Sequence, residues 1–294
     1  MRTEIDSLPV ERPGARYRSL RQLLNTSSGV IGIGIVSLYI VVALLGALGM
    51  TPYPPLQQNR ADRLQGPSWD YLMGTDVQGR DVASRVIKGG TNSLYVVVLS
   101  VALASSIGTT IGVISAYTGG YVDNIAMRVM DVFFAFPAVL LALLVVTILG
   151  AGLNNTILAI ALVYTPIFAR VARGPVLSLK ETEFVDAANC IGMRHWRILW
   201  RHILPNTMAP IIVQISLALS WALLTEAGLS FLGLGTPPPE PSWGTMLSES
   251  RGIAEIAPWL LFFPGLAIML SVLGFNLLGD SLRDALDPRL RGIK

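Results

Sequence analysis

The sequence has 294 residues, of which 52% are hydrophobic and only 14% are charged, and its mean hydropathy is +0.57. Soluble globular domains carry about a quarter charged residues, so this composition excludes an ordinary soluble domain and indicates a membrane protein. The formal net charge is +3, and Cys190 is the only cysteine, which excludes an internal disulfide.

The first 28 residues precede any long apolar run. Their start carries acidic residues and lacks a short apolar core, so it does not resemble a cleaved signal peptide. Residues 17–24 (YRSLRQLL) are basic and amphipathic. This pattern predicts an elbow helix along the inner membrane surface, where arginines are attracted to anionic lipid. We therefore expect residues 1–28 to form a cytoplasmic segment that contacts membrane lipid.

Five uncharged runs are long enough to cross a bilayer, which needs about 20 apolar residues per helix. They are residues 30–50, 89–122, 132–169, 203–225 and 256–279. The second run ends in a glycine-rich exit at residues 118–120. The third is interrupted at residues 150–155 (GAGLNN), a stretch typical of a tight turn between two helices. The pattern therefore predicts an all-α polytopic membrane protein with six transmembrane helices.

The runs also divide the chain into segments. We expect a first transmembrane helix at residues 29–50, an extracytoplasmic loop at 51–88, a transmembrane core at 89–280 and a cytoplasmic tail at 281–294. Six spans place both termini on one side, and cytoplasmic loops carry an excess of Lys and Arg. With the N-terminus inside, sixteen of the 22 Lys and Arg residues lie inside and six lie outside. The basic charge is therefore explained by topology, and nucleic acid is not expected as a partner.

Residues 181–206, between the fourth and fifth predicted spans, are charged and amphipathic, which is unusual in so apolar a chain. Gly192 can adopt the left-handed conformation that ends a helix. Pro205 is expected to block helix continuation, and Asn206 to cap the span that follows. The pattern predicts two short amphipathic helices at the inner membrane surface. A pair of helices packed only on lipid headgroups is the alternative interpretation.

Few polar side chains lie within the predicted spans. Ionisable residues in a membrane indicate functional sites, and Glu226 lies near the outer end of the fifth span, where it lines an exit gate or sits among headgroups. Asp131 opens the third span and is expected to pair with Arg128. We expect a weakly polar substrate path that includes Glu226, Gln214, Ser220 and Asn154. The mid-span positions are uncharged, which disfavours a proton-coupled secondary transporter.

Motifs of catalysis are missing from the sequence. No stretch fits the phosphate loop G-x-x-x-x-G-K-[ST] or the nucleophile elbow G-x-S-x-G. Cys190, His195 and His202 lie close together in the hairpin, but a closed zinc site needs four ligands and the chain has no further Cys or His. We expect no enzyme activity and no cofactor or metal bound by this chain itself.

Several stretches, in order along nearly the whole chain, resemble signatures of one family. They are GTDVQGRD at 74–81, DVFFAFP at 131–137, Ala187-Ala188 followed by Gly192 and ILPN at 203–206, LSFLGLG at 229–235, PSWG at 241–244 and NLLGDSLRDALDP at 276–288. The set resembles the C-type permease subunits of ATP-binding-cassette (ABC) importers in the dipeptide, oligopeptide and nickel branch. Asp186 stands where that family usually has Glu, and His202 where more distant permeases have Ile.

The resemblance implies the type I ABC importer permease fold and assigns a role to the hairpin 181–206. In this family the hairpin is the coupling helix that docks in a groove of the cytoplasmic ATPase. The implied coupling residues are Glu183, Asp186, Ala187, Ala188, Gly192, Arg197, His202, Leu204, Pro205 and Asn206. ATP and Mg²⁺ are then held by the partner ATPases and not by this chain.

The resemblance also implies partners and a mechanism. The partners are a second homologous permease that completes a heterodimeric pore, two ABC ATPase subunits and an extracytoplasmic solute-binding protein, all at a bacterial cell membrane. ATP binding closes the ATPases, and movement of the coupling hairpins opens the pore toward the loaded binding protein. Dipeptides or oligopeptides are the expected substrates. A nickel chelate, glutathione or another small solute is the first alternative, and a stand-alone secondary transporter is an alternative of a different class.

Overall fold

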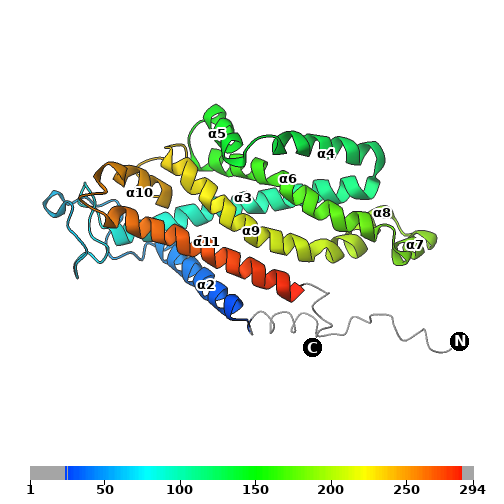
Figure 1. Cartoon of the computed structure of the whole chain (residues 1–294), viewed down its shortest axis with the longest axis horizontal. Coiled ribbons are helices and arrows are strands. Elements are labelled where there is room, and N and C mark those ends of the chain that lie inside the picture. Colours follow the sequence, from blue (N-terminus) through cyan, green and yellow to red (C-terminus); the bar gives the residue numbers. More distant parts are fainter. Residues whose placement is uncertain (1–23, 25, 287–294) are drawn as a thin grey trace.

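The structure, a computed structural model, describes residue 24 and residues 26–286. Within these residues it is a bundle of long helices, and pairing of extended backbone is limited to one isolated bridge between Thr75 and Asp81 (Figure 1). The expected all-α fold is confirmed. The elbow helix expected at residues 17–24, Leu24 excepted, and residues 287–294 of the expected tail lie outside the described residues.

Five helices in the described part are long and apolar enough to cross a membrane. They are α2 (Ser27–Ala47), α3 (Val82–Thr118), α6 (Leu153–Leu179), the helix His195–Phe231 that contains α9 (Leu204–Phe231), and α11 (Trp259–Leu286). A sixth span results if the bent pair α4 (Gly120–Phe134) and α5 (Ala138–Leu149) is counted as one. This agrees with the expected count of six only when the bent pair crosses the membrane as a unit.

The third predicted span, from residue 132 to the turn at 150–155, is not a single helix. α4 and α5 are bent by 90° at the break between them (Figure 1). Pro137 caps the start of α5 and explains the break, because proline lacks an amide hydrogen and disfavours a helical conformation at the residue before it. The 12 residues of α5 reach only about 18 Å, which is shorter than the roughly 30 Å hydrocarbon core.

Helix ends agree with several local signals in the sequence. α3 ends at Thr118, and Gly119 follows with a φ of 71°, at the glycine-rich exit that was predicted. α5 and α6 meet in the predicted turn, with Gly150 and Gly152 between them. α3 begins at Val82, so residues 82–88, which we expected in the outer loop, already form helix. α11 likewise runs to Leu286, into the segment that we expected as a tail.

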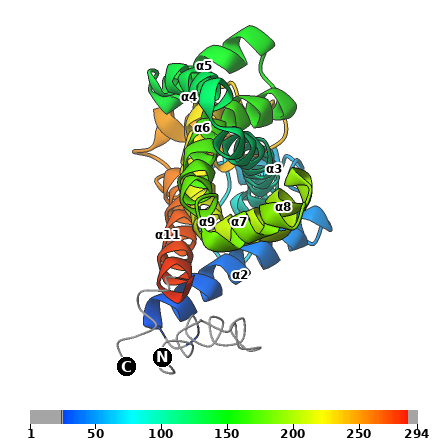
Figure 2. The same cartoon turned by 90° about the vertical axis from the view of Figure 1, so that its right-hand side faces the viewer.

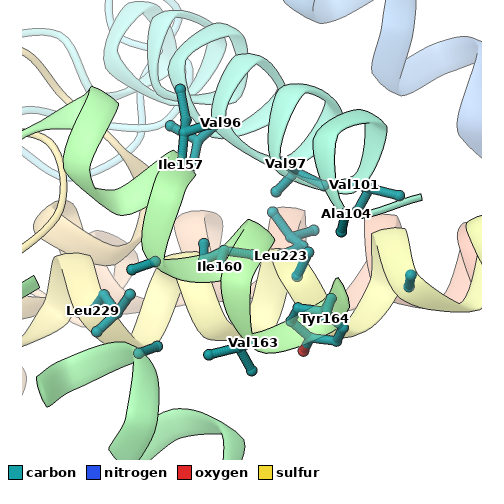
Figure 3. Packing of buried hydrophobic residues seen from close by; sticks show 14 of the residues in the cluster. Val96, Val97, Val101, Ala104, Ile157, Ile160, Val163, Tyr164, Leu223 and Leu229 are labelled. Carbon is teal, nitrogen blue, oxygen red and sulfur yellow. The ribbon is translucent and has the colours of Figure 1, made fainter. Parts of the chain in front are cut away.

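The core of the bundle is formed by α3, α6 and α9 (Figure 3). Two glycines let α3 lie directly against α6: a Cβ at Gly108 would lie 2.4 Å from the Thr165 carbonyl oxygen, and one at Gly112 would lie 2.2 Å from that of Ala169. Small residues at such contacts increase the van der Waals contact that holds membrane helices together. Around them pack buried apolar side chains that include Val97, Val101, Ile160, Tyr164 and Leu223.

The two ends of the bundle differ. At one end lie the non-helical segment 51–81, with a 3₁₀ turn at Arg60–Asp62, and α10 (Trp243–Ser250), which a second 3₁₀ turn at Arg251–Ile253 follows (Figure 1). At the other end lie α7 (Glu183–Cys190) and α8 (His195–Ile198) (Figure 1). The predicted coupling residues and the outer-loop signatures are therefore separated by the length of the bundle.

Candidate functional site

The first half of the predicted hairpin is the short helix α7. Glu183 and Asp186 lie in its first turn, where the partial positive charge of a helix N-terminus stabilises carboxylates. Both carboxylates and Ala187 are exposed, whereas Val185 and Ala188 are buried. α7 therefore has the predicted amphipathic form, with its charged side facing away from the bundle.

A Schellman motif ends α7 at the predicted glycine. Gly192 has a φ of 76°, its amide donates to the Asn189 carbonyl (2.9 Å), and the Met193 amide donates to the Ala188 carbonyl (3.0 Å). Glycine is favoured here because an L side chain is strained at a positive φ. A Cβ at this position would meet nothing within 4 Å, so the backbone conformation alone requires glycine.

The second half of the hairpin is not a separate helix, which corrects the prediction. α8, a π-helical turn at Leu199–Ile203 and α9 form one continuous helix, and Pro205 lies in the first turn of α9 without ending it. The wider π turn just before Pro205 relieves the clash that a proline ring makes with the preceding helical turn. Asn206 does not cap a helix; its Nδ2 donates to the His202 carbonyl one turn back (2.6 Å).

A buried apolar cluster attaches the hairpin to the bundle. It contains Val113 and Ala116 of α3, Ala172 and Val176 of α6, Val185 and Ala188 of α7, and Ile198, Leu199, Ile203 and Ile211. Viewed from this end, α7 and α8 lie across the ends of the longer helices (Figure 2). Two polar contacts add to the cluster: Tyr117 Oη lies 2.9 Å from His195 Nδ1, and Lys180 Nζ donates to the Ala116 carbonyl (3.2 Å). α7 therefore shares a buried core with α3, α6 and α9.

The remaining predicted coupling residues lie on this same end of the molecule. Arg197, Pro205 and Asn206 are exposed, while His202 and Leu204 are partly buried. Arg197 follows the Gly192 turn by five residues, on the first helical turn of the continuous helix. The ten predicted residues thus lie on α7, at the Gly192 turn and on the first part of the continuous helix.

The four residues predicted for the substrate path do not form a common surface. Glu226 has no exposed surface, and its Oε1 accepts a hydrogen bond from Ser230 Oγ (2.7 Å). The placement of Glu226 among lipid headgroups is therefore wrong. Ser220 is buried and donates to the Val272 carbonyl (3.3 Å). Gln214 is partly buried, and Asn154 is exposed in the first turn of α6.

A groove of about 330 Å³ lies elsewhere, between α3 and the first half of the continuous helix. Its lining includes Ser106 and Thr110 of α3 together with Trp196, Trp200 and Met208. None of the four predicted path residues lines it. The hydroxyls of Ser106 and Thr110 donate to carbonyls one turn back on α3, so the groove presents mainly apolar atoms.

Two ion pairs link α4 to α6. Arg173 donates from Nε to Asp123 Oδ1 (2.8 Å) and from Nη2 to Asp123 Oδ2 (2.6 Å), and Arg170 Nη2 lies 2.5 Å from Asp131 Oδ1. The prediction that Asp131 pairs with Arg128 is therefore wrong. No local pattern predicts this pairing, because Arg170 is 39 residues away from Asp131 and only the packing of α4 against α6 brings the two side chains close.

Sequence reasoning also missed an ionic cluster at the opposite end. Asp76 Oδ2 accepts a hydrogen bond from Arg80 Nε (2.6 Å) and lies 3.8 Å from Arg85 Nε. One oxygen of Glu249, on α10, accepts from both Arg80 Nη2 (3.0 Å) and Arg85 Nη2 (2.9 Å). Arg85 is only 1% exposed, so this is a buried charge with carboxylate partners. Asp76 and Arg80 belong to the GTDVQGRD stretch, which is the one local signal for this cluster.

Comparison with known proteins identifies the family. Residues 108–292 match the family model described as binding-protein-dependent transport system inner membrane component. The chain is 45% identical to the dipeptide transport system permease protein DppC of Alkalihalophilus pseudofirmus, over 93% of this chain and 90% of that protein. It is 44% identical to the glutathione transport system permease protein GsiD of Pectobacterium atrosepticum, over 89% of this chain and 87% of that protein.

A solved structure supports the fold. A chain of the MetNI methionine ABC transporter, in an inward-facing conformation, matches with a TM-score of 0.57 and 17% identity, over 69% of this chain and 96% of that one. The predicted type I permease fold is confirmed. ATP hydrolysis in this family belongs to separate ATPase subunits, in agreement with the missing phosphate loop. The chain belongs to the binding-protein-dependent transport system inner membrane component family and is a membrane-embedded permease subunit of an ABC importer.

Proposed function

We propose that this permease forms half of a heterodimeric pore that imports short peptides across a bacterial cell membrane. The names of two relatives support the substrate class, because one is a dipeptide permease and the other transports the peptide glutathione. The identities to the two are nearly equal, so glutathione is the second candidate and a nickel chelate the third.

The observation that carries the proposal is the attachment of α7 to the bundle. Its exposed side presents Glu183 and Asp186, and its buried side belongs to the cluster that includes α3 and α6. We infer that this exposed side, the Gly192 turn and Arg197 dock on a cytoplasmic ATPase subunit. ATP-driven movement of the ATPase then shifts α7, and the shared core moves α3, α6 and α9 with it, which alternates access to the pore.

The topology in this proposal has both termini in the cytoplasm. It is supported by the excess of Lys and Arg in the segments that would lie inside. The bent pair α4 and α5 then counts as one crossing, so that six crossings return the chain to the side where it began. α7 lies on the cytoplasmic side, and segment 51–81 and α10 lie outside.

The groove between α3 and the continuous helix is our candidate for part of the substrate path. Its apolar lining with scattered hydroxyls would bind a peptide weakly, which suits a pore that must release its cargo. We do not assign Glu226 to contact the peptide, because this residue of α9 is fully buried inside the bundle.

Uptake measurements test the substrate class. A strain that lacks this gene and its other peptide importers is supplied with a labelled dipeptide, labelled glutathione or a nickel–histidine chelate. We expect restoration of the gene to restore dipeptide uptake most strongly. Restoration of glutathione or nickel uptake alone would redirect the assignment to that solute.

A second experiment tests the docking of α7. We expect Asp186→Lys to leave insertion of the protein unchanged and to lower the amount of ATPase subunit that co-purifies, because the exposed carboxylate becomes a cation. Lys at Asn154, which is exposed far from α7, is the matched control and is expected to have no effect. Equal co-purification of the ATPase with Asp186→Lys would contradict the assignment.

A further inference from the structure

Trp69 has the greatest exposure among the large apolar side chains of the described residues. It is 96% exposed, whereas Tyr121, the next, is 86% exposed. Most other exposed apolar side chains lie on spanning helices, whose outer faces meet lipid. Trp69 instead lies in segment 51–81, which contains no helix longer than one 3₁₀ turn. Tryptophan is enriched among the residues that contribute most to protein–protein binding, so an exposed tryptophan outside the spanning helices is a candidate interface residue.

The turn that carries Trp69 is held in place from several sides. The Ser68 amide donates to the Tyr71 carbonyl (2.9 Å), and the Tyr71 amide donates to Ser68 Oγ (3.1 Å), so Trp69 and Asp70 form the tip of a tight turn. The Tyr53 hydroxyl donates to the Asp70 carbonyl (3.1 Å), and its ring lies 5.2 Å from that of Tyr71. The backbone at the tip is therefore already ordered before any partner binds, which lowers the entropic cost of binding.

The base of segment 51–81 is fixed to the membrane helices. The cluster of Asp76, Arg80 and Arg85 joins it to Glu249 of α10. Trp259, at the start of α11, donates from Nε1 to the Thr75 carbonyl (3.2 Å). Segment 51–81 is thus a platform attached to α3, α10 and α11, and a load on its tip would be transmitted to these helices.

We propose that Trp69 anchors the docking of the extracytoplasmic solute-binding protein on this permease. The inference rests on the proposed topology, which places segment 51–81 outside. Membership of a binding-protein-dependent family means that a soluble protein must dock on the outer face, at the end opposite α7 (Figure 1). The flanking Ser68 and Asp70 are exposed and polar, so the tip has an aromatic centre with a polar rim, as protein interfaces do.

The test uses the complete transporter in nanodiscs and its purified cognate binding protein. Binding is titrated through the stimulation of ATP hydrolysis. With Trp69→Ala, we expect the half-saturating concentration of binding protein to rise about tenfold or more, as for a tryptophan at an interface hot spot, with the maximal rate unchanged. Trp69→Phe is expected to recover part of the loss. Tyr121→Ala removes a similarly exposed aromatic ring at the opposite end and serves as the matched control.

The results of this titration distinguish a wrong role for Trp69 from a wrong proposed function for the permease. Equal titration curves for Trp69→Ala and the unsubstituted transporter would show that Trp69 does not anchor the binding protein. Loss of the second permease from the purified complex, or loss of inserted protein, would assign Trp69 to a subunit contact or to lipid and overturn the docking proposal. If the binding protein fails to dock on the unsubstituted transporter, the proposed partner itself is wrong and both proposals fall.

Discussion

The Gly192 turn gives the sharpest test of coupling through α7. Replacement of Gly192 by proline removes the amide that donates to the Asn189 carbonyl, and it fixes φ near −65°, far from the observed 76°. The turn between α7 and the continuous helix can then no longer form. Nothing lies within 4 Å of the position of a Cβ, so a steric clash with neighbouring elements does not contribute.

The alanine variant gives a graded effect whose size follows from the structure. The two hydrogen bonds of the Schellman motif contribute about 1–3 kcal/mol together. An L residue in the left-handed conformation costs roughly 1–2 kcal/mol, which cancels most of that contribution. We therefore expect Gly192→Ala to leave the turn formed in about half of the molecules. Gly192→Asn should be milder, because asparagine tolerates a positive φ.

The assay measures transport and ATP hydrolysis together in proteoliposomes that contain the complete transporter. We expect transported solute per ATP hydrolysed to fall about twofold with Gly192→Ala and to be lost with Gly192→Pro, while the protein still inserts. Gly49 is the matched control: it has a φ of 72°, open space around its Cβ position, and the same pair of hydrogen bonds at the end of α2. An unchanged ratio in Gly192→Pro, or an equal fall in Gly49→Pro, would refute the reasoning.

Three further predictions concern topology, the buried carboxylate and pH. In a Cys190→Ser background, an impermeant thiol reagent added outside should label a cysteine that replaces Ser68. A cysteine that replaces Ser178 should be labelled only after the membrane is permeabilised. The reverse labelling pattern would invert the proposed topology. Because Glu226 is fully buried, Glu226→Gln should change uptake of cationic and acidic peptides equally, and a selective loss of cationic peptides in uptake assays would show that the carboxylate meets the substrate. The hydrogen bond to Asp62 raises the pKa of Tyr71 above its ordinary value of 10.0. This hydrogen bond therefore stabilises segment 51–81 fully below pH 10, and the stabilisation is lost as the pH rises through the higher folded-state pKa of Tyr71. The protease resistance of segment 51–81 should fall over that pH range. Tyr71→Phe should remove this dependence of protease resistance on pH.

Local signals allowed much of the fold to be predicted from the sequence. Uncharged runs predicted where helices cross the membrane, because a bilayer rejects charge whatever the tertiary arrangement. Gly192 predicted the turn after α7, because its requirement is set by the backbone of a few neighbouring residues. The amphipathic spacing around it predicted which side of α7 is buried, as Val185 and Ala188 show.

By itself, then, the sequence determined the helical class, the approximate spans and the amphipathic element at one end. The tertiary structure alone decided whether Pro205 ends a helix, because the answer depends on a π turn held by packing against α3 and α6. It also decided that Glu226 is buried, and that Glu249 meets Arg80 and Arg85. Those arginines lie 169 and 164 residues from Glu249. Contacts across such separations leave no local pattern, since they arise only when distant helices pack side by side.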